Sequence, residues 1–268
     1  MAIKALLFDL DDTLMVDEAV SHETFAHVAA EASSRFGADP AQFASDAMAT
    51  ARALWAEGEC RPFCRSIGIS AFECLWGGFT GESTELTALR NWATAYRVEV
   101  FARVLALQGK EVPPDAASFL SAEFAATRRA RQRLMLGAME LMIDLSASHR
   151  LALLTNGAPD LQREKIAASG LESFFHAIAV SGEYGIGKPK PEIFHRLLGE
   201  LGVTPAEAVM VGNSLERDIA GARNAGIRSI WIRVPGSVEQ AEVTPDHTVT
   251  TLAEIPPILA TLHLSAKN

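Results

Sequence analysis

The chain has 268 residues, of which 49% are hydrophobic, and its 24 Lys and Arg against 33 Asp and Glu give a formal net charge of −9. This hydrophobic content supports a sizeable core and excludes an intrinsically disordered chain. The acidic balance argues against a nucleic-acid-binding protein, which needs a basic face for phosphate contacts. The length fits one large domain or two unequal ones.

The cysteines and the first residues of the chain favour a cytoplasmic protein. Three cysteines are an odd and sparse set, so we expect buried free thiols rather than a disulfide framework. The chain runs from Met1 directly into an acidic cluster, without the basic and long apolar segments of a signal peptide. No stretch approaches 18 uninterrupted apolar residues, so we expect neither a membrane span nor a membrane partner.

The first predicted element is a buried strand at 3–10, whose apolar residues run almost without interruption. From about residue 15 to 146 the sequence is instead rich in Ala, Glu, Arg and Leu, with helices predicted at 84–108 and 114–145. A segment of roughly 130 residues is too long for a structureless loop in a compact domain. We therefore expect an inserted helical domain at 16–146.

The rest of the chain alternates short apolar runs with amphipathic helices. This alternation indicates βαβ units and a parallel sheet that helices cover on both faces, which is an α/β fold. The expected core comprises residues 1–15 and 147–268. Its later strands are predicted at 150–155, 176–181, 208–211, 229–234 and near 248, and its helices at 159–169, 191–201, 215–225 and 251–262.

Four polar clusters follow predicted strands at their carboxyl ends, the edge of an open α/β sheet where ligands bind. The first is DLDDTL at 9–14. Three carboxylates in four residues repel one another and need a cation or a proton nearby. Asp9 and Asp11 are two positions apart, so they share a side of an extended segment. A solvated acidic turn or a helix N-cap is the alternative interpretation.

The second and third clusters carry groups suited to phosphate. Thr155-Asn156-Gly157 offers a hydroxyl and backbone N–H groups in a tight turn, although an ordinary strand–helix turn has the same composition. Lys188 precedes a proline, which holds it out of the helical conformation just before a predicted helix. We expect Lys188 to be functional and Lys190 to be a surface residue.

The fourth cluster is VGNSLERD at 211–218. A glycine turn is followed by an oxygen donor, Asn213, and by a carboxylate, Asp218, within the next helical turn. Asn213 or Ser214 could also act as a helix N-cap. Each of the later clusters is a weak signal alone, and the prediction depends on finding all four in this order at four strand ends.

Together these motifs resemble the haloacid dehalogenase (HAD) superfamily, whose four motifs are DxDxT, a Ser or Thr, a Lys, and an acidic GDxxxD-type signature. The resemblance covers 3–14 and 151–232 and implies a Rossmann-like parallel-sheet core with an inserted α-helical C1 cap. A more specific likeness is to phosphatases of the acylneuraminate-9-phosphatase and pyrimidine 5′-nucleotidase type. They share the LTNG stretch at 154–157, the QREK helix at 162–165 and the VGxSLE pattern at 211–216.

The resemblance implies a phosphatase in which Asp9 attacks phosphorus and becomes a transient aspartyl phosphate. Asp11 would protonate the leaving oxygen and then activate water, and a neighbouring carboxylate is expected to favour its protonated form. Thr155, Asn156 and Lys188 would bind the phosphate oxygens, whose charge they stabilise.

The resemblance also implies a Mg²⁺ cofactor. The ion would take oxygens from Asp9, from the backbone carbonyl of Asp11 and from Asn213, with waters completing the shell. Asp218 would act through water or orient Lys188. The family carries an aspartate where this chain has Asn213. One negative charge is therefore missing, and weaker magnesium binding than in an aspartate-bearing relative is expected.

Three alternatives stay open on the sequence. A 2-haloacid dehalogenase on the same fold is favoured by Asn213 but disfavoured by Asp11, because displacing halide from carbon needs no acid. A phosphomutase would return the phosphoryl group to a sugar instead of water. A non-catalytic phosphoacceptor module is disfavoured by Asp11 and Thr155, for which it would have no use.

The expected partner is a small phosphomonoester, either a sugar phosphate or a nucleotide, and not a nucleic acid. The sequence carries no signal for an oligomeric state. In C1-capped relatives the cap shapes the pocket for the leaving group. Candidate lining residues in this chain are the aromatic and arginine residues of the insertion: Trp55, Arg61, Phe63, Arg65, Trp76, Phe79 and Trp92.

Overall fold

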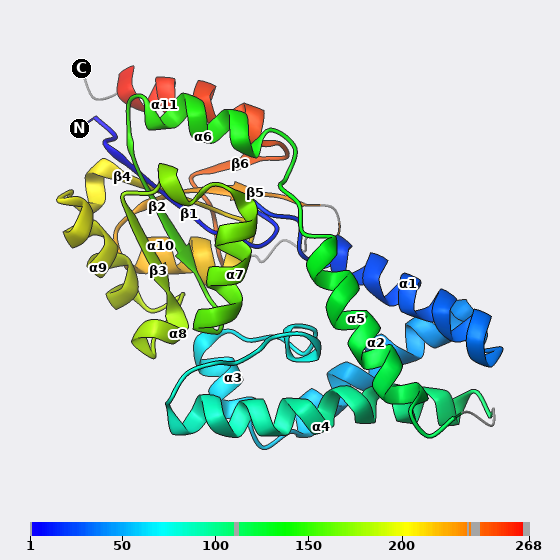
Figure 1. Cartoon of the computed structure of the whole chain (residues 1–268). Coiled ribbons are helices and arrows are strands. Elements are labelled where there is room, and N and C mark those ends of the chain that lie inside the picture. The colour runs from blue at the N-terminus through cyan, green and yellow to red at the C-terminus, as the bar shows by residue number, and fades with distance from the viewer. Residues whose placement is uncertain (1, 110–112, 235, 237–241, 265–268) are drawn as a thin grey trace. The chain divides into compact units, whose positions relative to one another are not determined.

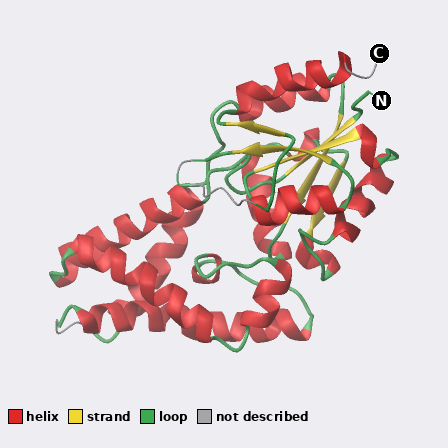
Figure 2. Ribbon diagram, turned by 180° about the vertical axis from the view of Figure 1, so that it is seen from behind, coloured by secondary structure: helices red, strands yellow, loops and turns green. Residues whose placement is uncertain are grey.

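The computed structural model describes residues 2–109, 113–234, 236 and 242–264. The chain forms two compact units. Unit 1 comprises residues 1–16, 133–157 and 162–268, and unit 2 comprises residues 17–132 and 158–161. The strands of the described residues all lie in unit 1, whereas unit 2 consists of helices and loops (Figures 1 and 2).

The sheet of unit 1 confirms the predicted α/β fold. Its described strands are all parallel and lie in the order β3-β2-β1-β4-β5-β6. The inner strands are apolar almost throughout because helices cover both faces of the sheet. The strands are β1 (Ala5–Phe8), β2 (Arg150–Thr155), β3 (Ala177–Val180), β4 (Ala208–Gly212), β5 (Arg228–Ile232) and β6 (His247–Val249).

Alternate residues of each strand build the two halves of the core. In β1, Leu6 and Phe8 pack with α6 and α11, whereas Ala5 and Leu7 pack with α9 and α10 on the opposite face (Figure 1). Both halves are buried, which fixes the strand register. The helices of unit 1 are α6 (Ala138–Ser146), α7 (Pro159–Ser169), α8 (Ser181–Tyr184), α9 (Pro191–Leu201), α10 (Ala220–Asn224) and α11 (Ile255–Leu264).

Most elements of the core follow the sequence prediction. Helices α7 and α9 have the predicted bounds, and α9 ends where Gly202 adopts a left-handed conformation (φ 63°). The predicted helix 215–225 is different, because it begins with a wider π-helical turn at Leu215–Ile219 before α10. In that turn Ser214 O accepts hydrogen bonds from the amides of both Asp218 and Ile219.

The predicted single helix 114–145 is wrong. The chain leaves α5 (Ala116–Ala130) and passes through a non-helical segment before α6 begins. Within that segment the Met135 amide donates to Leu14 O (2.8 Å), and Gly137 has a positive φ of 83°. A backbone amide that pairs with another segment cannot pair within a helix, so the helix is interrupted there.

This interruption also moves the domain boundary. The sequence placed the end of the insertion at residue 146, whereas the long segment of unit 2 ends at Gln132 and α6 belongs to unit 1. The reason is packing, because Leu141, Met142 and Leu145 of α6 bury their side chains in the core beside the sheet. Unit 2 also includes residues 158–161, the start of α7.

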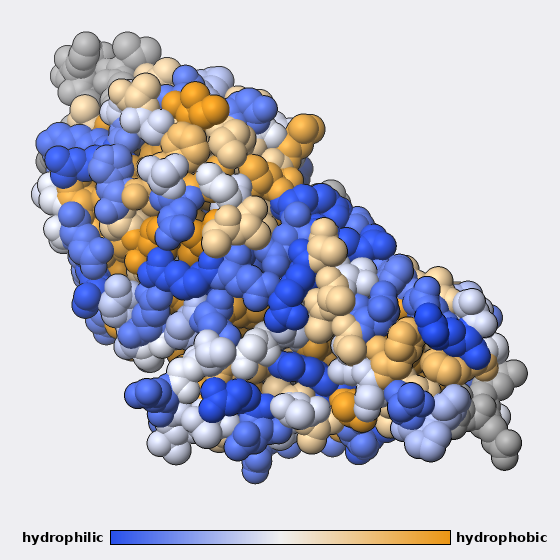
Figure 3. Space-filling model, viewed as in Figure 1, coloured by the Kyte–Doolittle hydropathy of each residue, from blue (hydrophilic) through white to orange (hydrophobic). Residues whose placement is uncertain are grey.

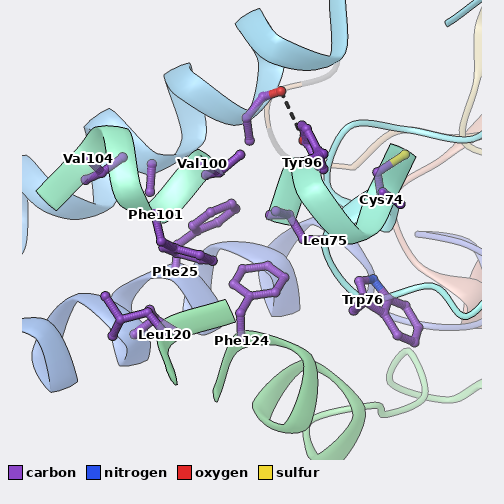
Figure 4. Close-up of a cluster of buried hydrophobic side chains, with 14 of the residues drawn as sticks. Phe25, Cys74, Leu75, Trp76, Tyr96, Val100, Phe101, Val104, Leu120 and Phe124 are labelled. Atoms are coloured by element: carbon purple, nitrogen blue, oxygen red, sulfur yellow. Dashed lines mark hydrogen bonds between the residues drawn. The ribbon is translucent and has the colours of Figure 1, made fainter. Parts of the chain in front are cut away.

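Unit 2 has a core of its own, built by helices around a group of aromatic side chains (Figure 4). The ring of Phe124 lies 4.8 Å from that of Phe25 and 6.1 Å from that of Phe101, measured between centroids. Such contacts add to the free energy of apolar burial. The helices are α1 (Glu18–Phe36), α2 (Pro40–Glu57), α3 (Arg61–Ile67), α4 (Thr84–Leu107) and α5.

Two expectations from composition can be compared with the structure. Cys60, Cys64 and Cys74 are free and buried, as predicted. Across the described ranges, the structure has no helix of the length and apolarity that a membrane crossing requires. Figure 3 shows hydrophilic residues interspersed with hydrophobic ones over the visible surface of both units.

A buried tyrosine in unit 2 gives a test of this core. The Tyr96 hydroxyl lies 3.0 Å from Ala51 O and 2.8 Å from Ala71 O, and its single hydrogen is shared between these two carbonyls (Figure 4). We predict that Tyr96→Phe lowers the free energy of unfolding by about 1–2 kcal/mol, because buried carbonyls lose a donor. Urea unfolding would measure this.

The chain offers a matched control in its second tyrosine, Tyr184, which stacks with Arg196 at the surface of unit 1. Tyr184→Phe should change the unfolding free energy by less than about 0.5 kcal/mol. Equal effects of the two substitutions would contradict the role assigned to the Tyr96 hydroxyl.

Candidate active site

A buried lysine joins two of the predicted site carboxylates. Asp9 directly follows β1, and its amide donates to Val211 O of the neighbouring strand β4 (3.0 Å). The Lys188 ammonium donates to Asp9 Oδ1 (2.5 Å) and lies 2.8 Å from Asp218 Oδ1. Residues from three distant parts of the sequence therefore meet at the carboxyl edge of the sheet, as the motif order predicted.

The charge state of Lys188 depends on these two carboxylates. Burial disfavours its ammonium form, but Asp218 and Asp9 outweigh that effect and raise the pKa of Lys188 above its ordinary value. Burial and the charge of Asp9 raise the pKa of Asp218, and the Lys188 ammonium opposes this. The two carboxylates therefore favour the charged form of Lys188, since removing its charge would leave buried carboxylates without a partner.

Asp218 is held by the π-helical turn that follows β4. Its Oδ2 accepts a hydrogen bond from the Ser214 amide (2.9 Å), and its side chain is fully buried. Gly212 lies so close that an added Cβ would overlap the Asp218 carboxylate. Glycine is therefore required at this position by close approach and not by a left-handed backbone.

Asn156 positions Lys188 through its side chain. The Asn156 Nδ2 group donates to Lys188 O, and the Lys188 amide donates to Asn156 Oδ1, both at 2.9 Å. A Cβ on Gly187 would lie 2.6 Å from Asn156 Oδ1, so the adjacent glycine allows this pairing. Asn156 was predicted to bind phosphate. The side-chain contacts that the structure shows are instead with the Lys188 backbone, so Asn156 positions the loop that carries Lys188.

Two threonine hydroxyls lie buried in the same region. The Oγ1 atoms of Thr13 and Thr155 are inaccessible to solvent, and among the residues that the structure describes they have no hydrogen-bond partner. Buried hydroxyls normally have partners, so these two are candidates for hydrogen bonding to a ligand or to water. Thr155 is the residue whose hydroxyl the sequence motifs predicted to bind a phosphate oxygen.

Asp11 has a different environment from the one predicted. Lys165 Nζ donates to both carboxylate oxygens of Asp11 (3.0 Å each), and Gln162 Nε2 donates to Asp11 Oδ2 (3.1 Å). The sequence motifs predicted a neighbouring carboxylate as the partner of Asp11, whereas these hydrogen bonds come from an ammonium group and an amide group.

Asp9 and Asp11 also do not share one side of an extended segment. The chain turns after Leu10, whose carbonyl accepts the amides of both Leu14 and Met15 (2.9 Å each). As a result Asp9 pairs with Lys188 while Asp11 pairs with Lys165. Asp9 and Asp11 therefore each have a cation of their own, which reduces the electrostatic repulsion expected between the two carboxylates.

Asn213 follows β4 beside Asp9. The Trp231 indole N–H of β5 donates to the Asn213 backbone carbonyl (2.8 Å), which fixes the main chain at this point. The Asp9 carboxylate, the Asp11 carbonyl and the Asn213 side-chain amide would supply oxygen atoms alone. This donor set fits Mg²⁺, which prefers hard oxygen ligands, and would suit zinc poorly.

A protein-family model for haloacid dehalogenase-like hydrolases matches residues 3–226 of the chain, which span all four motifs. The chain belongs to this family. The match confirms the resemblance that the sequence motifs indicated.

Similar proteins of this family include phosphatases. Phosphoserine phosphatase of Thermus thermophilus is 39% identical over 256 residues, 94% of this chain and 98% of that protein. N-acylneuraminate-9-phosphatase of Rattus norvegicus is 41% identical over 124 residues, 46% of this chain and 50% of that protein. The solved HAD hydrolase YfnB of Bacillus subtilis bound to magnesium has a TM-score of 0.66 at 21% identity, covering 97% of this chain and 99% of its own, which shows a shared fold.

The motifs of this hydrolase predicted no role in the site for Gln162 or Lys165, although their helix is part of the family resemblance. A signal was present in the helical spacing. Leu161 and Ile166 belong to the buried side of α7, and both Gln162 and Lys165 are as buried as they are. A lysine among core positions of an amphipathic helix needs a buried acidic partner, and this requirement points to the acidic cluster.

Unit 2 of the hydrolase contains a hollow of about 480 Å³, lined by aromatic and charged side chains that include Arg52, Trp55 and Phe72. Trp55 was among the predicted lining residues of the insertion. Two other candidates, Trp76 and Phe79, are instead buried in the core of unit 2.

The close approach at Gly212 leads to a prediction. Gly212→Ala should lower the free energy of unfolding by about 2 kcal/mol or more, because the new methyl group displaces Asp218 from Lys188. Gly199→Ala is the matched control, since a Cβ there meets nothing within 4 Å and the residue lies in helix α9. It should leave stability unchanged or raise it by up to about 1 kcal/mol. Equal losses in urea unfolding would refute the steric argument.

Proposed function

We propose that this protein is a phosphatase that hydrolyses a small phosphomonoester through a phosphorylated Asp9. The observation that carries the proposal is the arrangement around Lys188. A buried cation lies 2.5 Å from the carboxylate that directly follows β1, and the neighbouring strand β2 ends at Thr155, whose buried hydroxyl has no hydrogen-bond partner among the described residues. A cation, a hydroxyl and a nucleophilic carboxylate on one strand edge suit the transfer of a phosphoryl group.

The proposed reaction has two displacements at phosphorus. Asp9 attacks first, and Asp11 gives its proton to the oxygen of the leaving alcohol. Asp11 then takes a proton from the water that attacks the aspartyl phosphate, so that phosphate leaves and Asp9 is regenerated. Lys188 and the Thr155 hydroxyl bind the non-reacting oxygens, while Asn156 and Asp218 hold Lys188 in position.

A magnesium ion completes the proposal. Asp9, the backbone carbonyl of Asp11 and Asn213 would hold it, and it would supply positive charge that offsets the repulsion between Asp9 and a phosphate dianion. The chain's own cations, Lys188 and Lys165, do not replace this charge, because each already pairs with a carboxylate.

The environment of Asp11 favours the phosphatase over the dehalogenase. Displacing halide from carbon needs no acid, whereas Asp11 is held by both Lys165 and Gln162. A non-catalytic phosphoacceptor would likewise have no use for that arrangement. A phosphomutase would use the same residues, so the fate of the phosphoryl group separates it from a phosphatase: release to water or return to a sugar.

For the substrate we propose a small phosphomonoester, with phosphoserine to be tested first. The support is the likeness to phosphoserine phosphatase of Thermus thermophilus, which extends over 98% of that protein. The likeness to N-acylneuraminate-9-phosphatase covers half of that protein. Sugar phosphates and nucleotides, the substrate classes that the sequence motifs favoured, are therefore tested beside phosphoserine.

The first experiment measures phosphate release from phosphoserine, a sugar phosphate panel and nucleoside monophosphates, with and without Mg²⁺. We expect magnesium-dependent turnover that Asp9→Asn reduces by at least about 10³-fold, because no nucleophile is left. Asp144→Asn, an exposed aspartate of α6, is the control and should keep full activity. Turnover that survives Asp9→Asn would reject the proposal, and halide release from 2-chloropropionate would favour the dehalogenase.

The asparagine in the fourth motif gives a second prediction. Asn213→Asp should tighten magnesium binding by about tenfold, because it restores a carboxylate to the donor set. Isothermal titration with Mg²⁺ in the absence of substrate measures this without relying on activity. Glu216→Gln, which alters an exposed carboxylate three residues away, should leave the affinity unchanged. Identical affinities of Asn213→Asp and wild type would remove Asn213 from the metal site.

A further inference from the structure

The contacts of Asp11 point to residues outside the four motifs. Two side chains of helix α7 reach it: Lys165 donates to both of its oxygens (3.0 Å each), and Gln162 donates to one of them (3.1 Å). The carboxylate thus accepts three hydrogen bonds from one rigid helix. Such an arrangement fixes the orientation of a side chain as well as its charge.

The burial of this pair is asymmetric. The Lys165 side chain is 2% exposed, whereas that of Asp11 is 24% exposed. Burying an ammonium group costs free energy that an apolar residue at the same helix position would avoid. The chain nevertheless has lysine there, between the core residues Leu161 and Ile166. The lysine directs a partly open carboxylate, which is an arrangement typical of a functional site rather than a core.

Gln162 links this arrangement to the phosphate-binding turn. Its Nε2 group donates a second hydrogen bond to Asn156 O (2.6 Å), so both of its N–H bonds are used. Gly157 packs against the same side chain, because an added Cβ would lie 2.5 Å from Gln162 Nε2. The orientation of Asp11 is thereby tied to the turn that carries Thr155.

We propose that Lys165 and Gln162 are positioning residues that hold Asp11 for both of its proton transfers. This inference rests on the proposed phosphatase function. Neither residue touches the phosphate in this scheme, and each acts through Asp11.

The proton balance shows what such positioning would do. In the first step a bond forms from Asp9 to phosphorus, the bond from phosphorus to the leaving oxygen breaks, and the Asp11 proton moves to that oxygen. Asp11 is then a carboxylate, and the hydrogen bonds from Lys165 and Gln162 hold it in place for the second step. In the second step Asp11 accepts a proton from the attacking water while the bond from Asp9 to phosphorus breaks, and phosphate is released.

The test compares an alkyl phosphate with p-nitrophenyl phosphate in Lys165→Met. An alkoxide needs a proton to leave, whereas p-nitrophenolate leaves without one. We therefore expect kcat/KM to fall about 10- to 100-fold for the alkyl phosphate and less than about threefold for the aryl phosphate. The attack of water on the aspartyl phosphate is the same step for both substrates. If Lys165→Met slows this step, kcat and KM for the aryl phosphate fall together and their ratio changes little.

Three comparison variants make the result specific. Asp11→Asn should also lower kcat/KM more for the alkyl phosphate than for the aryl phosphate, and by a larger factor than Lys165→Met. Lys165→Arg keeps the cation and should recover part of the alkyl phosphate rate. Arg163→Met removes a basic residue of the same helix, whose surface pair with Glu183 (2.8 Å) is unrelated to the site, and should leave both rates unchanged.

The outcomes separate the inference from the function beneath it. If Asp11→Asn splits the two substrates and Lys165→Met does not, the positioning role is wrong and the phosphatase stands. An equal fall in kcat/KM for both substrates in Lys165→Met would indicate a structural defect and would contradict the positioning role. Circular dichroism and urea unfolding would detect such a defect. Absence of magnesium-dependent turnover of either substrate by the wild type would overturn the proposed function and the inference together.

Discussion

The ion pair network of Lys188 is the interaction on which the candidate active site depends. Its ammonium group lies between Asp9 and Asp218, and all three side chains are buried. Two buried carboxylates without this cation would repel each other, and a buried lysine without them would lose its charge. The three groups are therefore mutually dependent, and the surrounding chain holds them at these positions.

The positions of these three side chains are set by backbone features rather than by further charges. The parallel pairing of β1 with β4 sets Asp9 beside the Gly212–Asn213 segment, and a glycine at 212 leaves room for the Asp218 carboxylate. The reciprocal hydrogen bonds of Asn156 attach the Lys188 backbone to the end of β2. Small residues and main-chain groups thus determine where the charged atoms lie, which is why a single added methyl group is costly there.

The sequence predicted the sheet, and the place of the motifs at its strand ends, because both depend on local patterns. Apolar runs that alternate with amphipathic helices specify a parallel sheet, and the motifs follow its strands. The limits of unit 2 were not predictable in this way, since α6 reads as a continuation of α5 and only its packing beside the sheet assigns it to unit 1. The partners of Asp11 were also missed, because Lys165 is 154 residues away in sequence and meets it through the fold.

The two lysines explain how carboxylates only two positions apart could serve different roles. Asp9 is nearly closed to solvent and its carboxylate is held by the buried Lys188 ammonium, which fixes its position as the proposed nucleophile requires. Asp11 pairs with an equally buried lysine but is itself 24% exposed, so it can exchange protons with water and with a leaving group. The turn after Leu10 is what separates the pairs, because an extended chain would bring both carboxylates to one cation. On the proposed mechanism, this turn is as necessary as the carboxylates, since it lets one strand end supply a nucleophile and an acid–base group with independent charge states.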